Sequence, residues 1–185
     1  MAGPVMVGVC AITVAITDFP AGLRDSKMLS APRREKLAPL LLVWAPTAVG
    51  AASAAEIDEL GITACLGLAA KRALIALHEA GVPVGESTVL LDGAHDWLNP
   101  ALTSKLHVIT RVKADQDCAV VAAASVVAKV HRDALMVELD GEHPQYGWAS
   151  NKGYGAAIHM DAIRTVGVTG YHRQTWVKTP VGRTE

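Results

Sequence analysis

The sequence is poor in cysteine and has no strong excess of charge of either sign. Its three cysteines lie far apart among Ala, Val and Leu, which favours small buried thiols over a disulfide framework or a cysteine metal site. The formal net charge is −1 and the sequence pI is near 6.6. These values give no bulk electrostatic reason to expect a polyanion partner, so any basic surface that binds nucleic acid must be local.

Long apolar runs are also missing. No uninterrupted stretch reaches the roughly 18 apolar residues expected of a membrane span. The apolar opening, residues 1–16, lacks a basic N-terminal region and is interrupted by Gly and Pro, so it indicates a core strand rather than a signal peptide. We therefore expect a cytoplasmic protein without membrane contacts. Repeats and linkers are absent from the sequence too, so we expect one domain over residues 1–185, present as a monomer.

The chain is rich in apolar residues, and their periodicity predicts an α/β fold. With 51% hydrophobic residues among 185, it can bury a sizeable core. Continuous apolar runs predict buried strands, and apolar stripes of helical period predict helices. The predicted strands cover residues 4–14, 48–52, 88–91 and 107–112, and the predicted helices cover 30–42, 62–77, 119–139 and 156–165. Such a succession indicates a mixed sheet with helices on both faces.

Two aspartates, Asp92 and Asp115, follow predicted strands. Strand ends are places where a rigid scaffold delivers side chains into a crevice. Two converging carboxylates would suit Mg²⁺ or Mn²⁺, which prefer oxygen ligands, and they would repel one another unless a cation lay between them. Turn chemistry is the alternative, since Asp-Gly at residues 92 and 93 is a common turn sequence. Spacing alone does not decide between the two interpretations.

Six short segments, taken together, resemble those of ribonuclease HII, the type 2 ribonuclease H family. They are Asp25-Ser26-Lys27, Glu56-Ile57-Asp58-Glu59-Leu60, Leu91-Asp92-Gly93, Lys113-Ala114-Asp115, residues 123–133, and Asn151-Lys152-Gly153-Tyr154-Gly155. One such segment would be weak support, whereas six in register are strong. The resemblance extends from Ala2 to Trp176, which is nearly the whole chain.

The resemblance implies a ribonuclease H-like sheet of five strands, flanked by helices, and an active site of four carboxylates. Asp92 and Asp115 match two of them. The other two belong to an Asp-Glu-x-Gly-Arg-Gly segment that family members carry just before an Ala-Gly-Pro-Val stretch, whereas here that stretch follows Met1 directly. We therefore expect the first, central strand to be absent, and we favour a truncated sequence over an evolved short form. Two unpaired buried edges would then make the chain fold poorly.

The resemblance also implies the reaction, which is endonucleolytic hydrolysis of RNA in RNA–DNA hybrids and at single ribonucleotides in duplex DNA. The products would carry 5′-phosphate and 3′-hydroxyl ends, Asp92 and Asp115 would bind Mn²⁺ or Mg²⁺, and the process served would be ribonucleotide excision repair. Tyr154 matches a tyrosine that packs against the sugar, and Lys27 and Lys152 are placed to meet phosphates. The alternatives are a turn tyrosine and solvated lysines. For the whole chain, the alternative is a catalytically inactive hybrid-binding remnant, or a fragment that does not fold.

Other polar and aromatic side chains receive mainly structural interpretations. Lys129 and Arg132 either cover the surface of the long helix with their aliphatic stems or touch DNA. Asp133 is expected to form salt bridges rather than bind metal. Tyr146 is expected to pack in the core, and His172 to have a structural role or lie near the substrate.

Overall fold

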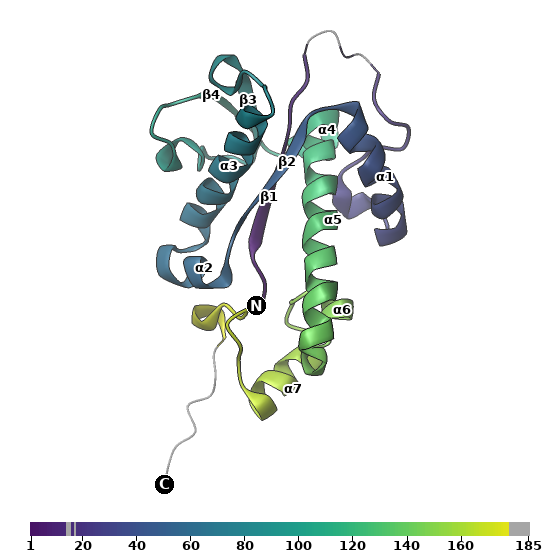
Figure 1. The fold of residues 1–185 in the computed structure, drawn as a ribbon, viewed down its shortest axis with the longest axis vertical. Helices are drawn as coiled ribbons and strands as arrows, with labels where there is room; N and C mark the ends of the chain where they lie inside the picture. Colours follow the sequence, from purple (N-terminus) through teal and green to yellow (C-terminus); the bar gives the residue numbers. More distant parts are fainter. Residues whose placement is uncertain (14–15, 17, 178–185) are drawn as a thin grey trace.

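The computed structural model describes residues 1–13, 16 and 18–177, and its strands form two separate two-stranded sheets (Figure 1). Strand β1 (Val5–Cys10) pairs antiparallel with β2 (Thr47–Ala52). Strand β3 (Thr88–Asp92) pairs parallel with β4 (His107–Arg111). Within the described ranges, the other edges of β1 and β3 have no strand partner. The α/β class and the mixed strand directions are therefore confirmed.

Helices surround the strands. They are α1 (Ala31–Trp44), α2 (Ala54–Leu60), α3 (Ile62–Glu79), α4 (Ala114–Asp117), α5 (Ala119–Glu142), α6 (Trp148–Asn151) and α7 (Ala157–Val166), with short 3₁₀ turns η1 (Ser26–Met28), η2 (Val84–Glu86), η3 (Asn99–Ala101), η4 (Pro144–Tyr146) and η5 (Gln174–Trp176). The four predicted helices correspond to α1, α3, α5 and α7. Strand β1 is shorter than its predicted run, whose last residue, Val14, lies outside the described residues.

Sequence periodicity did not predict α2. This helix begins with a capping box, in which the Ser53 hydroxyl accepts the Glu56 N–H and the Glu56 carboxylate accepts the Ser53 N–H. The sequence signal was Ser53-x-x-Glu56, the standard spacing of that motif. Gly61, with φ of 80°, ends α2 and lets α3 begin in a new direction. A seven-residue helix carries too few apolar repeats for periodicity to reveal it.

The β1–β2 sheet lies between α3 on one face and α5 on the other (Figure 1). Both helices approach the strands closely because glycines face them. A Cβ atom on Gly8 would lie 2.2 Å from the Ala124 carbonyl oxygen of α5, and one on Gly50 would lie 1.9 Å from the Ala69 carbonyl oxygen of α3. Real Cβ atoms do not approach so closely, so both positions need glycine for packing.

A separate aromatic core lies where α5, η4, α6 and α7 meet. Its largest members, Tyr146 and Trp148, are stacked with ring centroids 4.9 Å apart, and both are buried. The Tyr146 hydroxyl donates to the Gly167 carbonyl at 2.9 Å, which satisfies its polar end. The structural role predicted for Tyr146 is thereby confirmed.

All three cysteines are free thiols, as expected, although only Cys65 is fully buried; Cys10 and Cys118 are half-buried. None of the helices in the described part of the chain combines the length and apolar character needed to cross a membrane.

Candidate active site

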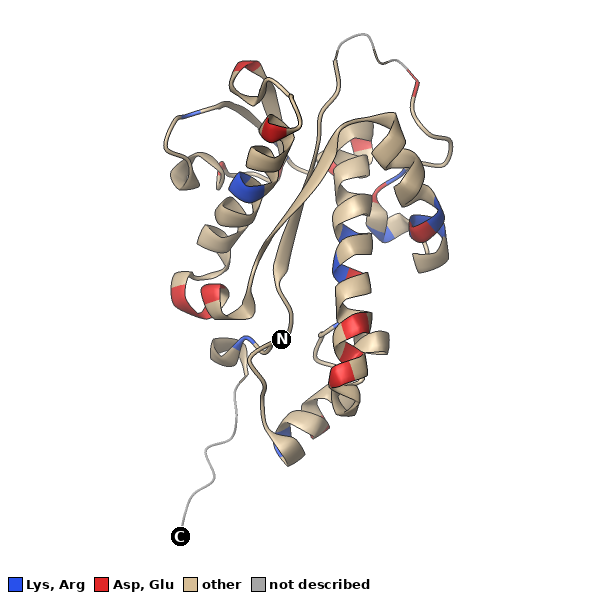
Figure 2. Ribbon diagram, in the orientation of Figure 1, with Lys and Arg blue, Asp and Glu red and all other residues tan. Residues whose placement is uncertain are grey.

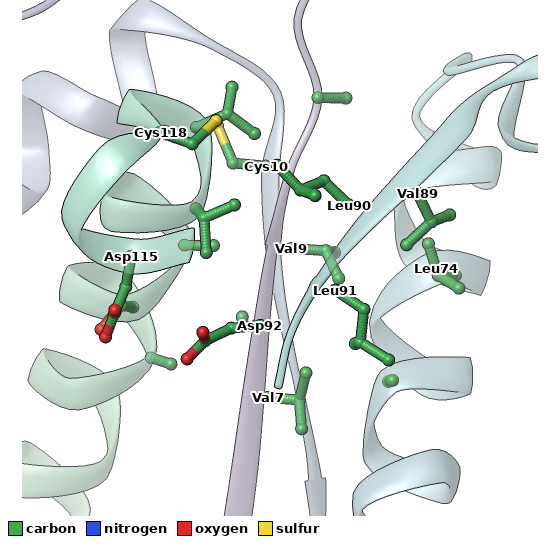
Figure 3. A pocket seen from close by; sticks show the side chains of 18 of the residues that line it. Val7, Val9, Cys10, Leu74, Val89, Leu90, Leu91, Asp92, Asp115 and Cys118 are labelled. Atoms are coloured by element: carbon green, nitrogen blue, oxygen red, sulfur yellow. The ribbon is translucent and has the colours of Figure 1, made fainter. Parts of the chain in front are cut away.

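A cavity of about 580 Å³ lies between the free edges of β1 and β3 (Figure 3). Apolar side chains from the two strands, α3 and α5 form most of its wall, including Val7, Val9 and Leu91. Polar side chains also line it, among them Asp92 and Asp115, and Figure 3 shows these two carboxylates near one another at one end. The two aspartates singled out in the sequence are therefore brought to one place by the fold.

Asp92 is the last residue of β3, and its side chain is exposed to solvent. Its Oδ1 atom accepts the Ala114 backbone N–H at 3.0 Å. The residue thus has a local structural role, since it joins the end of β3 to the start of α4. Among the described residues no hydrogen bond engages its Oδ2 atom, so the carboxylate can also serve as a ligand.

The sequence suggested that Asp115 lies directly at a strand end, but in the structure it does not. Strand β4 ends at Arg111, and Lys113 then adopts a left-handed backbone conformation with φ of 60°. This turn starts the one-turn helix α4 at Ala114 and directs Asp115 inward, where it is 5% exposed. Sequence reasoning identified the residue but not the turn that positions it.

Lys27 lies against the buried carboxylate, with its Nζ atom 3.4 Å from Asp115 Oδ2. The Asp115 charge is the main cause that raises the pKa of Lys27, and the Asp25 and Asp92 carboxylates contribute in the same direction. The Asp25 side chain accepts the Lys27 backbone N–H at 2.9 Å and so shapes η1. An exposed ammonium group therefore pairs with a buried carboxylate, and the Asp25 and Asp92 carboxylates add negative charge to its surroundings.

Two further residues connect the Lys27 segment to the helices. The Ser26 and Ser125 hydroxyls are 2.6 Å apart, which joins η1 to α5. Arg34 donates to the Ser26 carbonyl at 2.9 Å and forms an ion pair with Asp133 at 3.6 Å. Sequence reasoning assigned no role to Arg34, although Ser26 and Ser125 both lie within segments that carried the family resemblance.

The carboxylates of Asp92 and Asp115 are hard oxygen donors, which fit Mg²⁺ or Mn²⁺ in chemical type. Within residues 1–13, 16 and 18–177, however, no group of three or more His, Cys, Asp or Glu side chains is arranged to hold a metal. Two carboxylates leave most positions of a six-coordinate Mg²⁺ to water, substrate or other ligands. The described residues therefore fit part of a metal site.

Tyr154 lies in the turn between α6 and α7 and is 61% exposed. Its ring is 5.8 Å from the Lys129 ammonium and 5.5 Å from the Arg132 guanidinium. Both cations also line the cavity, so they lie between Tyr154 and the carboxylate site. Lys152, two residues earlier, has a left-handed backbone, and its Nζ donates to the Ala149 carbonyl. An exposed aromatic ring thus stands beside positive charge.

Arg132 and Lys129 have partners that the sequence did not indicate. Arg132 donates to the carbonyl oxygens of Ala2, Pro4 and Lys152 at 3.0 to 3.2 Å, so it anchors backbone on two sides of α5. Lys129 forms an ion pair with Asp133 at 2.6 Å. The expectation that Asp133 forms salt bridges is confirmed.

The chain is similar in sequence to proteins named ribonuclease HII. A family model described as ribonuclease HII matches residues 1–179. A protein named ribonuclease HII from Streptomyces avermitilis is 48% identical over 176 residues, which cover 95% of this chain and 71% of the relative. Another, from Cereibacter sphaeroides, is 42% identical over 176 residues, covering 95% of this chain and 78% of the relative.

Two solved structures share the fold. Ribonuclease H2 from Pyrococcus horikoshii has a TM-score of 0.67 at 23% identity, with 95% of this chain and 87% of that chain covered. Bst-RNase HIII, solved in complex with Mn²⁺, has a TM-score of 0.69 at 23% identity, with 90% of this chain and 58% of that chain covered. These likenesses show a ribonuclease H-like arrangement.

Proposed function

The chain belongs to the ribonuclease HII family of endoribonucleases, and we propose that it hydrolyses RNA in RNA–DNA hybrids and at single ribonucleotides in duplex DNA. The observation that carries this proposal is the convergence of Asp92 and Asp115 at one end of the cavity between β1 and β3. Cleavage would leave 5′-phosphate and 3′-hydroxyl ends. The protein would act as a cytoplasmic monomer in ribonucleotide excision repair.

Asp92 and Asp115 would hold Mn²⁺ or Mg²⁺ together with further ligands, among which the expected Asp-Glu pair is the foremost candidate. A bound divalent ion supplies activation of water and stabilisation of the leaving oxygen in phosphodiester hydrolysis. Asp92 presents its carboxylate at the mouth of the site, while the burial of Asp115 keeps its carboxylate in a low-dielectric surrounding. Lys27, which already neutralises Asp115, would shift toward a phosphate when a metal enters.

Tyr154, Lys152 and Lys27 would bind the substrate. The exposed Tyr154 ring provides a flat apolar surface for the sugar at the ribonucleotide, where the 2′-hydroxyl distinguishes RNA from DNA. Lys152 lies beside it and Lys27 lies at the carboxylates, so the two lysines would meet phosphates at two separated points. Such contacts position the duplex, and the tyrosine contributes discrimination.

The test is cleavage of an end-labelled duplex that contains one ribonucleotide, in Mn²⁺ and in Mg²⁺. The chain as printed would be compared with a form extended upstream by an Asp-Glu-x-Gly-Arg-Gly strand. We expect cleavage 5′ of the ribonucleotide by the extended form only, because two carboxylates give too few metal ligands. Asp92→Asn and Asp115→Asn should each lower the rate in the extended form by at least about 100-fold, since each removes a charged ligand.

Asp117→Asn is the matched control. This residue lies two positions from Asp115, but it is exposed and paired with Arg111 at 2.6 Å. We expect it to retain cleavage. Binding without cleavage by the extended form would favour the inactive hybrid-binding alternative, and rapid cleavage by Asp92→Asn would reject the metal site. Cleavage by the chain as printed would contradict the four-carboxylate arrangement.

A further inference from the structure

Two buried histidines lie beneath the Tyr154 turn, and the reaction proposed above does not use them. His159 of α7 and His172 are each at most 1% exposed, and their Nε2 atoms are 3.1 Å apart. The buried Trp148 indole donates to His159 Nε2 at 3.1 Å. Every polar atom in this buried network needs a hydrogen-bond partner, because an unpaired polar group in the interior would destabilise the fold.

The hydrogen-bond partners determine where each proton lies. His159 Nδ1 is 2.8 Å from the Tyr154 carbonyl oxygen, which can only accept, so Nδ1 carries the proton. His159 Nε2 must then accept, as the indole contact requires. His172 Nδ1 accepts the Thr169 backbone N–H at 2.9 Å, so His172 donates from Nε2 to His159. Both imidazoles are therefore neutral, and each has one defined tautomer.

This network ends on the backbone of Tyr154. The Tyr154 carbonyl accepts both the His159 imidazole and the Ala156 N–H, at 2.8 and 2.9 Å, while its own N–H donates to the Asn151 carbonyl at 2.9 Å. The peptide groups on either side of Tyr154 are thus held, although its ring is largely exposed. Lys129 and Arg132 lie against the ring, at 5.8 and 5.5 Å from its centroid.

We propose that His159 is a positioning residue for substrate recognition: by holding the Tyr154 carbonyl, it presets the exposed ring for the sugar of the ribonucleotide. The inference rests on the proposed function of Tyr154. A preset ring avoids the conformational entropy of ordering the turn when the duplex binds. Trp148 and His172 act one step further away, since they hold His159 in the tautomer that donates to Tyr154.

The variants separate positioning from simple folding. His159→Leu removes the donor, whereas His159→Asn supplies an amide N–H near the position of Nδ1 and should restore it. Tyr154→Ala removes the ring itself. We would measure the affinity for a duplex with one ribonucleotide and for the matching all-DNA duplex without divalent ions, and the ratio of the two affinities is the preference.

We expect His159→Leu to lower this preference by about 3- to 10-fold, as the loss of a preorganised contact would. The preference should return in His159→Asn. In the Tyr154→Ala background, His159→Leu should have no further effect, because it acts through the ring. An equal loss of affinity for both duplexes, or additive effects in the double variant, would reject the positioning role. Thermal unfolding of each variant verifies that it is folded.

Chymotrypsin provides a second readout that does not depend on the substrate. Cleavage after Tyr154, identified by mass spectrometry, should accelerate in His159→Leu and return to the original rate in His159→Asn, with cleavage after Trp44, at the end of α1 and away from this network, as internal reference. Unchanged cleavage after Tyr154 would overturn the inference. If the original chain showed no preference for the ribonucleotide, the role of Tyr154 would fail, and the protease result would still decide whether His159 positions the turn.

Discussion

At the scale of single residues, several polar side chains form hydrogen bonds or ion pairs with residues that lie far away in the sequence. Lys27 illustrates this: besides the phosphate contact predicted for it, it forms an ion pair with Asp115, 88 positions later. Arg132 was left between surface cover and DNA contact, yet its guanidinium holds carbonyl groups of Ala2 and Pro4. The residue type indicated a charge, and the fold selected its partner.

The buried His172 should make stability depend on pH. Burial is the main cause that lowers its pKa from 6.5 to about 4, and the neighbouring His159 contributes. The unfolded chain therefore binds more protons between these values. We expect the contribution of His172 to the free energy of unfolding to be complete above pH 6.5 and to be lost as the pH is lowered toward about 4.

Urea unfolding at pH 7, 5.5 and 4.5 would check this expectation. His172→Gln keeps a donor toward His159 but does not titrate, so its stability should decrease less over the same range. His143, His159 and the Met1 amino group also lie near His172 and remain in both proteins, and His159, whose own pKa is lowered by burial, should leave a smaller residual decrease in His172→Gln. A decrease of equal size in both proteins would show that His172 does not carry the effect.

At the scale of elements, the packing of α3 and α5 on β1 and β2 depends on two glycines. Gly8→Ala should force α5 away from β1, and Gly50→Ala should force α3 away from β2, because backbone atoms occupy the space that a Cβ needs. We expect each to cost about 1–3 kcal/mol, the usual range for overpacking. Thermal unfolding would measure the loss.

Gly141 is the matched control for these substitutions. It lies in the last turns of α5 with open space around a Cβ, so Gly141→Ala should stabilise the helix by about 0.5–1 kcal/mol. If Gly8→Ala and Gly50→Ala unfolded at the original temperature, the close approach of helix and strand described above would be wrong.

The elements also show where periodicity is informative and where it is not. The apolar stripes of α3 and α5 extend over several turns, and both helices were predicted to within three residues at each end. Helices α2 and α4 have seven and four residues, so a capping box and a left-handed Lys113 define them instead. Short elements are decided by local hydrogen bonds and turns, which apolar spacing does not report.

At the scale of the whole molecule, the near-zero net charge conceals an uneven distribution. Figure 2 shows Lys and Arg on α1 and along the middle of α5, whereas Asp and Glu gather toward the far end of α5 and on α2. Of these basic side chains, Arg34 and Lys129 pair with Asp133, and Lys129 and Arg132 lie beside the Tyr154 ring.

Asp58 joins α2 to the C-terminal part of the described chain. Its carboxylate accepts the Gln174 and Thr175 N–H groups at 2.7 and 3.0 Å and the Thr175 hydroxyl at 2.5 Å. Burial raises the pKa of Asp58, but these hydrogen bonds outweigh it and lower the pKa overall. The segment around Asp58 contributed to the family resemblance without an assigned role, and the structure shows it fastening η5 to α2.

Asp58→Ala should release this fastening. We expect a loss of about 1–3 kcal/mol, because hydrogen bonds to a charged acceptor disappear, and faster amide exchange at residues 174 and 175. Urea unfolding and hydrogen exchange would measure the two effects. Glu59→Ala, a change at the exposed neighbouring residue, is the control and should alter neither; slow exchange at residues 174 and 175 in Asp58→Ala would contradict the role.

The sequence by itself determined the α/β class, the long helices, the four strands and the family. These depend on periodicity within one element and on short segments, which are local properties. It also identified Asp92, Asp115 and Tyr154 as candidates, since residue type and neighbours mark them.

Only the tertiary structure decided how those residues meet. The cavity that brings Asp92 and Asp115 together depends on the contact between β3 and α4. A hydrogen bond between two residues 22 positions apart joins these elements. The defined tautomer of His159 depends on Trp148 and His172, which other segments place around it. Such contacts depend on where distant segments pack, and a one-dimensional pattern contains no distances between them.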